Sequence, residues 1–123
     1  MPRKAGREIT YFDMGNIEVR LQDNEAKRSV ELSHGDKLVL RLDSNPSTGY
    51  QWQVASMSGN VLDWVEGPSY LPSEPSLIGS GGTASFGFLA LNKGRASLKL
   101  IYRRPWEEGK PPARTVVLKV RIK

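Results

Sequence analysis

Short segments in which apolar and polar residues alternate recur along most of this chain, and they constrain its fold more than any other feature. Such alternation has the period of a strand with one buried and one solvated face, and no segment shows a helical stripe. The pattern therefore predicts an all-β fold, an antiparallel sandwich or barrel. Of these we expect an immunoglobulin-like antiparallel β-sandwich of about seven or eight strands. The expected strands cover residues 17–21, 30–32, 38–42, 50–54, 61–65, 84–88, 96–102 and 116–122.

The bulk properties predict a single soluble domain. A length of 123 residues fits one domain, which we place over residues 16–123 after a basic and mobile segment 1–15. No cysteine is present, which excludes a disulfide, a thiolate zinc site and a thiol nucleophile. No apolar run is long enough to cross a membrane, and segment 1–15 lacks the apolar stretch of a signal peptide. We expect a monomer without a membrane partner, and the compartment stays open.

The connections between the expected strands alternate between long and short. In a sandwich whose successive strands reverse direction, every second connection falls at the same end. The long connections should therefore emerge together as one binding edge, with the tight turns at the opposite end. The long connections are residues 44–49, 67–82 and 104–113, and the short ones are 33–36, 57–60 and 92–94.

Each long connection contains a motif of rigid or small residues. In this order and at this spacing, the motifs resemble the signature of the chagasin-type inhibitors of papain-like cysteine proteases. The resemblance runs from about Asn16 to the C-terminus. The motifs are Asn45-Pro46-Ser47-Thr48-Gly49-Tyr50, Gly79-Ser80-Gly81-Gly82 and Arg104-Pro105-Trp106.

The resemblance implies a reversible, competitive and non-covalent inhibitor that needs no cofactor. Residues 47–49 would enter the protease cleft at the catalytic cysteine, with residues 79–82 on one side and 104–106 on the other. Ser47 departs from the family, which usually has Thr at this position, and the change removes a methyl group while it keeps the hydroxyl.

The residues themselves are consistent with displayed loops. Pro46 fixes its own φ and holds Asn45 extended, while Gly49 admits a positive φ. Trp106 follows a stiffening proline among charged residues, so we expect an exposed aromatic anchor of the kind that dominates interface energetics. By contrast, Trp52 and Trp64 lie in apolar strand patterns, and we expect both in the core.

Catalysis and metal binding have little support in the sequence. The order Ser33-His34-Gly35-Asp36 places neighbours on one tight turn, whereas a catalytic triad needs groups that converge from separate elements. One histidine cannot form the usual zinc site, and the carboxylates lack the pattern of an ion-binding loop. We expect neither an enzyme nor a metal site.

Two other functions stay open as alternatives. In a carbohydrate-binding or adhesion module, Trp106 would stack on a sugar ring. In a small nucleic-acid binder, the formal net charge of +5 would supply the attraction, but the Lys and Arg residues are scattered along the sequence and form no dense stripe. Neither alternative explains the glycine-rich segment 79–82, so we expect no nucleic-acid partner.

Overall fold

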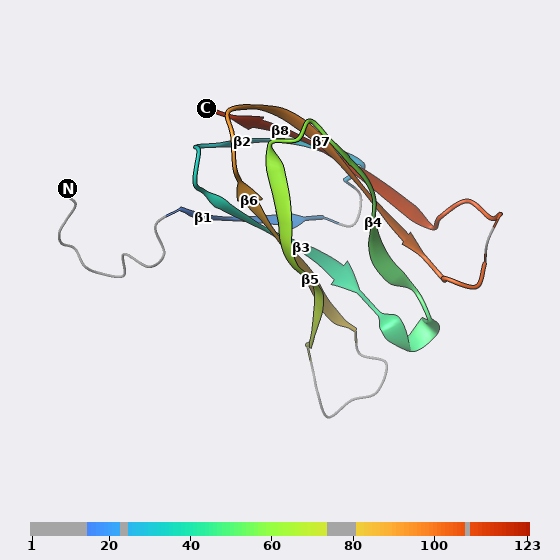
Figure 1. The fold of residues 1–123 in the computed structure, drawn as a ribbon. Helices are drawn as coiled ribbons and strands as arrows, with labels where there is room; N and C mark the ends of the chain where they lie inside the picture. The colour runs from blue at the N-terminus through green and yellow to red at the C-terminus, as the bar shows by residue number, and fades with distance from the viewer. Residues whose placement is uncertain (1–14, 23–24, 74–80, 108) are drawn as a thin grey trace.

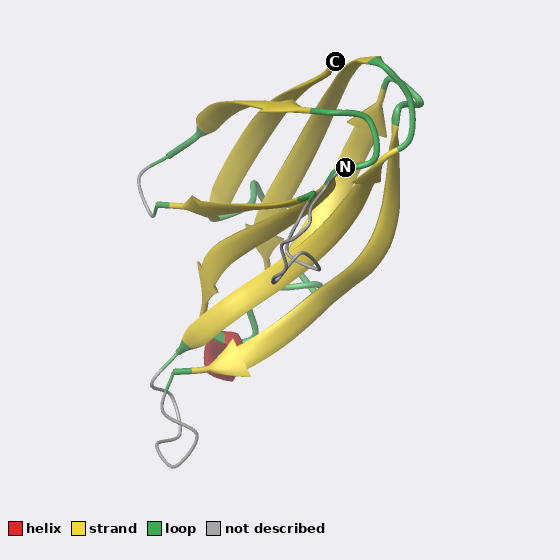
Figure 2. Cartoon of the chain, turned by 90° about the vertical axis from the view of Figure 1, so that its left-hand side faces the viewer, coloured by secondary structure: helices red, strands yellow, loops and turns green. Residues whose placement is uncertain are grey.

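The computed structural model describes residues 15–22, 25–73, 81–107 and 109–123, and these form a sandwich of two four-stranded sheets (Figures 1 and 2). One sheet has the order β1-β3-β6-β5 and the other β2-β8-β7-β4. The predicted all-β sandwich of seven or eight strands is confirmed, with eight. The strands are β1 (Asn16–Leu21), β2 (Lys27–Leu32), β3 (Lys37–Ser44), β4 (Gln51–Ser58), β5 (Leu62–Pro72), β6 (Gly82–Ala90), β7 (Gly94–Arg103) and β8 (Arg114–Ile122).

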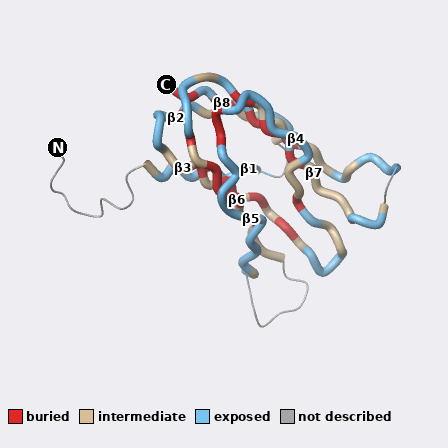
Figure 3. The backbone as a smooth tube through the Cα atoms, viewed as in Figure 1, coloured by how far each residue is buried: buried red, intermediate tan, exposed pale blue. Residues whose placement is uncertain are grey.

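The inward positions of both sheets form one apolar core, which appears as the red segments of Figure 3. The alternation predicted from the sequence is clearest in β3 and in β8 from Val116 onward, where every second residue is buried. Burial of these side chains is the main favourable term for a fold that has no disulfide. The fully buried members with the largest side chains are Phe86, Phe88, Leu21, Leu32, Leu38, Leu40, Leu42, Leu98, Leu100, Leu118 and Val116.

Two strand pairings differ from the expected antiparallel arrangement. β1 pairs with β3 in parallel, and β2 pairs with β8 in parallel, whereas the other four pairings are antiparallel. β1 and β2 follow each other in the chain but lie in different sheets. Each is therefore an edge strand that pairs with a strand that does not follow it in the sequence, β1 with β3 and β2 with β8. Alternation identifies a strand but carries no information about its partner.

The predicted connection over residues 67–82 is wrong in its first part, because β5 continues to Pro72. Pro68 lies within this strand, which proline tolerates because β5 is at the edge of its sheet and because the register shifts between Glu66 and Ser69. The β5–β6 connection is therefore shorter than predicted, residues 73–81. Residues 74–80 of it, with the predicted Gly79 and Ser80, lie outside the described residues, as does segment 1–14.

Trp64 is also placed wrongly by the sequence, since its side chain is not in the core. It is 43% exposed on β5, next to a register shift between Trp64 and Glu66, and its indole nitrogen donates to the Glu66 carbonyl at 2.9 Å. The predictions for the other two tryptophans are confirmed, because Trp52 is 2% exposed and Trp106 is 69% exposed.

Candidate functional site

Every second connection emerges at the same end of the sandwich, as the sequence predicted (Figure 1). We call this end, with residues 45–50, 81–82 and 104–107, the loop pole. The short turns 33–36, 59–61 and 91–93 meet at the other end, where Gly35 and Leu91 donate backbone hydrogen bonds to Ala90 and Val61. The described residues of the β1–β2 connection, Gln22, Glu25 and Ala26, also lie at the loop pole, a position that the sequence analysis did not consider.

The β3–β4 connection is held by its own hydrogen bonds. Residues Pro46–Thr48 form one turn of 3-10 helix, and the Asn45 side chain accepts from the Ser47 hydroxyl at 2.6 Å and from its backbone N–H at 3.3 Å. The Thr48 hydroxyl donates to the Asn45 carbonyl at 2.9 Å, and the Gly49 N–H donates to Pro46 at 2.9 Å. The turn is therefore ordered without a partner, which lowers the entropic cost of docking.

The β7–β8 connection rests directly on this turn. Gly49 has φ +88°, and a Cβ atom at this position would overlap Cη2 of Trp106, so the indole lies against the bare glycine backbone. Arg104 donates from Nε to the Thr48 carbonyl at 2.8 Å. Two motifs separated by more than fifty residues thus form one surface, from which the Trp106 ring projects.

The described end of the glycine-rich motif, Gly81 and Gly82, lies beside the start of the same turn, next to Ser44 and Asn45. Gly82 is the register partner of Ser44, the last residue of β3. A Cβ atom on Gly81 would lie 3.5 Å from the Ser44 carbonyl and 4.0 Å from Cβ of Asn45. Thr48, Gly82 and Trp106, one from each of the predicted long connections, therefore share one edge of the molecule, which confirms that these connections emerge together.

A stack of aromatic rings and guanidinium groups supports the turn from below. The rings of Tyr50 and Tyr102 lie 5.2 Å apart, and Trp52 follows at 4.8 Å from Tyr102. Arg104 caps one end over Tyr50 at 4.5 Å, a cation–π geometry, and Arg114 caps the other over Trp52 at 5.1 Å. We call these five residues the aromatic stack, and it joins the turn to β4, β7 and β8.

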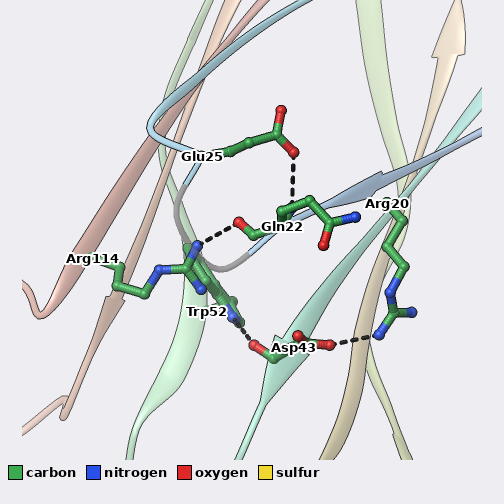
Figure 4. A network of polar contacts seen from close by, with 6 residues as sticks. All are labelled: Arg20, Gln22, Glu25, Asp43, Trp52 and Arg114. Carbon is green, nitrogen blue, oxygen red and sulfur yellow. Dashed lines mark hydrogen bonds and ion pairs between the residues drawn. The ribbon is translucent and has the colours of Figure 1, made fainter.

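A polar network connects this stack to both sheets (Figure 4). The Trp52 indole donates to the Asp43 carbonyl at 2.9 Å, and Arg114 donates to the Gln22 carbonyl at 3.0 Å. The Gln22 N–H in turn donates to the Glu25 carboxylate at 2.8 Å, and this bond lowers the pKa of Glu25 below its ordinary value. The base of the loop pole is therefore fixed across the two sheets.

The basic residues near the β7–β8 connection are partly neutralised. Glu107 lies 3.7 Å from Arg104 and 3.4 Å from Lys110, and both are ion pairs. Together with Tyr50 and Arg103, Glu107 and Lys110 line a hollow of about 300 Å³ beside the stack. In the described residues, no group of His, Asp and Glu side chains could hold a metal ion, and no helix is long and apolar enough to cross a membrane.

Comparison with known proteins assigns this architecture to a family. The model for "Chagasin family peptidase inhibitor I42" matches residues 31–120. The chain belongs to the chagasin family. The match contains all three motifs of the loop pole, and it confirms the resemblance read from the sequence. It also confirms the expectation of a non-enzyme, because the proteins of this family are inhibitors of peptidases.

Relatives and solved structures agree with this assignment. The chain is 30% identical to amoebiasin-2 of Entamoeba histolytica over 109 residues, which cover 84% of each protein. It is 32% identical to chagasin of Trypanosoma cruzi over 75 residues, which cover 58% of this chain and 68% of chagasin. The crystal structure of EhICP2, a cysteine protease inhibitor of Entamoeba histolytica, superposes with a TM-score of 0.72 at 27% identity, over 88% of this chain and 97% of that one.

Proposed function

We propose that this chagasin-family protein is a reversible, competitive and non-covalent inhibitor of papain-like cysteine proteases. The observation that carries the proposal is the convergence of three motifs at the loop pole, with an exposed tryptophan held on a glycine. The similar E. histolytica structure is named a cysteine protease inhibitor, which is the broader class that contains the proposed target. The protease-binding residues proposed are Asn45, Pro46, Ser47, Thr48, Gly49, Tyr50, Gly79, Ser80, Gly81, Gly82, Arg104, Pro105 and Trp106.

The shape of the β3–β4 turn supports occupation of the cleft without cleavage. A protease cuts a peptide that lies extended across its nucleophile, whereas Pro46–Thr48 form a 3-10 turn that ends in the left-handed Gly49. Extension would break the bonds that Asn45 receives from Ser47 and Thr48. A disulfide with the catalytic cysteine is excluded, because the chain has no cysteine.

Trp106 is the residue whose role is easiest to test. Its indole is exposed and rigidly seated, so it can bury a large apolar area on a partner at little entropic cost. Trp106→Ala should raise the inhibition constant for papain by roughly 30-fold, which corresponds to about 2 kcal/mol, a typical value for an interfacial aromatic hot spot. The thermal midpoint of the variant should stay close to that of the wild type.

The experiment is a titration of papain at several substrate concentrations, with recovery of activity on dilution and intact mass measured on the same samples. Trp64→Ala is the control, because it removes an equally large exposed indole from β5. Full papain activity at a large molar excess of the wild type would contradict the proposal. Equal inhibition by Trp106→Ala and wild type would remove Trp106 from the interface.

A further inference from the structure

The outer face of the β2-β8-β7-β4 sheet carries a concentration of positive charge that the loop pole does not use. Ala96, Leu98 and Leu100 of β7 are buried, so the residues between them point outward, and β2 and β8 show the same alternation in their second halves. The only carboxylate that the strand pattern places on this face is Glu31 of β2. We call the outward cations the cationic face; they are Lys27, Arg95, Lys99, Lys119 and Arg121.

On the opposite sheet, the cations of the outer face are paired with carboxylates. On its outer face, Arg20 pairs with Asp43 at 2.5 Å and Arg41 pairs with Glu18 at 3.0 Å. Lys37 forms a further ion pair with Glu66 of β5. Each of these cations has a carboxylate beside it, so the β1-β3-β6-β5 face is close to neutral. Of the two sheet faces, the one formed by β2, β8, β7 and β4 is therefore the face with an excess of positive charge.

Stability does not account for the cationic face. The register of β7 and β8 places Arg95 directly opposite Arg121, and like charges in such a position destabilise a sheet. Glu31 lies 3.6 Å from Arg121 and 3.3 Å from Lys123, and within the described part of the chain Lys27, Arg95, Lys99 and Lys119 form no ion pair. A repulsive arrangement of this kind favours a role in binding an anion.

Hydroxyl groups lie among these cations. Lys119 is the register partner of Ser29 on one side and of Ser97 on the other. Ser97 is in turn the register partner of Ser58. These three serines line a broad, open hollow of about 720 Å³ together with Arg95 and Arg121. Lys119 already donates to the Ser97 hydroxyl at 3.3 Å. Guanidinium, ammonium and hydroxyl donors on an open sheet suit the oxygens of sulfate groups spaced along an extended chain.

We propose that the cationic face binds a sulfated polysaccharide. Single-stranded nucleic acid is favoured less, because such strands stack on aromatic rings, and the exposed Trp64, Tyr70 and Trp106 lie elsewhere. A membrane surface is favoured less because, among the described residues of β2, β7 and β8, no large apolar side chain is exposed to enter lipid. A sulfated glycan needs neither feature.

The cationic face and the loop pole occupy different parts of the molecule. The face covers the middle and far half of one sheet, whereas the pole is formed by the connections at one end. The inhibitor can therefore stay bound to a polyanion while its loops engage a protease. Such binding would hold the protein at a matrix or cell surface, and it is independent of the target proposed above.

The test compares two triple variants that remove the same charge from the two faces. Arg95→Gln, Lys119→Gln and Arg121→Gln change the cationic face, while Arg20→Gln, Lys37→Gln and Arg41→Gln change the paired face. Binding of a heparin decasaccharide is measured by calorimetry in about 0.15 M salt, where long-range attraction is largely screened. We expect the first variant to bind at least about tenfold more weakly, because three cations on the proposed contact surface are lost, and the second to stay within about twofold of wild type.

Several outcomes would overturn the proposal. An equal loss in both variants would mean that net charge alone attracts heparin, and equal binding of fully desulfated heparin would exclude sulfate recognition. Tighter binding of a single-stranded oligonucleotide or of phosphatidylserine vesicles would assign the face to another class of partner. If the triple variant of the cationic face does not fold, judged by circular dichroism, Lys119→Gln is compared with Lys37→Gln. Saturating heparin should leave papain inhibition unchanged.

Discussion

Gly49 shows how a single residue shapes the loop pole. Its φ of +88° lies in the left-handed region, where a side chain is strained, and the space that a Cβ would fill is occupied by the Trp106 ring. The residue therefore acts in two ways, since it ends the 3-10 turn and forms the seat of the indole. These two roles can be separated by experiment.

Gly49→Ala should lower the free energy of unfolding by about 1–2 kcal/mol from backbone strain and should also displace Trp106. Gly35→Ala is the matched control, because Gly35 has φ +94° but nothing within 4 Å of its missing Cβ. Both variants should lose similar stability in urea denaturation. Only Gly49→Ala should change the tryptophan emission and weaken papain inhibition.

A Gly35→Ala variant that weakened inhibition as much as Gly49→Ala would show that general destabilisation explains both. An unchanged inhibition constant in Gly49→Ala would mean that the position of the indole does not matter for binding. Either result would separate Trp106 from the role proposed for it.

The three tryptophans show which aspects of side-chain burial can be predicted from the sequence. Trp52 continues a strand alternation and Trp106 follows a proline among charges, and both environments were predicted correctly. Trp64 lies in an equally apolar segment, but it belongs to an edge strand with a register shift beside it. Neither the edge nor the shift has a signal in a single sequence, because both depend on which strands pair.

At the scale of elements, the aromatic stack makes β4 and β7 the support of the β3–β4 turn. The Tyr102 hydroxyl accepts a hydrogen bond from the Asn45 N–H at 2.9 Å, at the point where the turn begins. The ring of Tyr102 also lies between Tyr50 and Trp52. The hydroxyl and the ring can be tested separately, because phenylalanine keeps the ring.

Tyr102→Phe should cost about 0.5–1.5 kcal/mol of stability, the usual net value of one hydrogen bond. It should also speed amide exchange at Asn45 and weaken papain inhibition, because the turn becomes less ordered before docking. Tyr50→Phe is the control, since the Tyr50 hydroxyl has no hydrogen-bond partner within the described residues. Equal exchange at Asn45 in both variants would show that the hydroxyl does not hold the turn.

The existence of the strands was predictable, whereas their extent and partners were not. Alternation located most of the eight strands, because these bury every second side chain, whereas β5 was expected only from the segment 61–65. The continuation of β5 through Pro68 was missed, since proline ends a strand unless the strand lies at an edge. The parallel pairs β1–β3 and β2–β8 join segments whose sequences carry no mark of direction.

For the whole molecule, the alternation of long and short connections gives the sandwich two unlike ends. The described residues of all three proposed binding loops lie at one end, and the turn at residues 91–93 lies at the other (Figure 1). One inhibitor can therefore engage one protease, and changes at the far end should be tolerated.

A Gly-Ser insertion between Asn92 and Lys93 should leave the inhibition constant for papain within about twofold of wild type. The same insertion between Ser47 and Thr48 should weaken inhibition at least about tenfold, equivalent to about 1.4 kcal/mol, because it disrupts the ordered turn. Thermal midpoints serve as the control for folding. Equal effects of the two insertions on inhibition would contradict a single binding end.

The placement of the long connections at one end and of the short turns at the other was predictable from loop lengths. The cationic face was not predictable in this way. Its five cations come from β2, β7 and β8, and they are scattered in the sequence. Their assembly follows from the pairing of β8 with both β2 and β7. A sequence analysis that counts charges along the chain therefore finds no cluster, although the fold creates one.

The core of this sandwich is closed by packing alone, without any covalent cross-link between its sheets. A thiol protease is active only while its own cysteine is reduced, because the thiolate is the attacking species. Reductants that activate such an enzyme would unfold many small disulfide-dependent inhibitors, but they have no bond to break here. The reducing conditions that the proposed target needs are therefore conditions under which this inhibitor loses no cross-link.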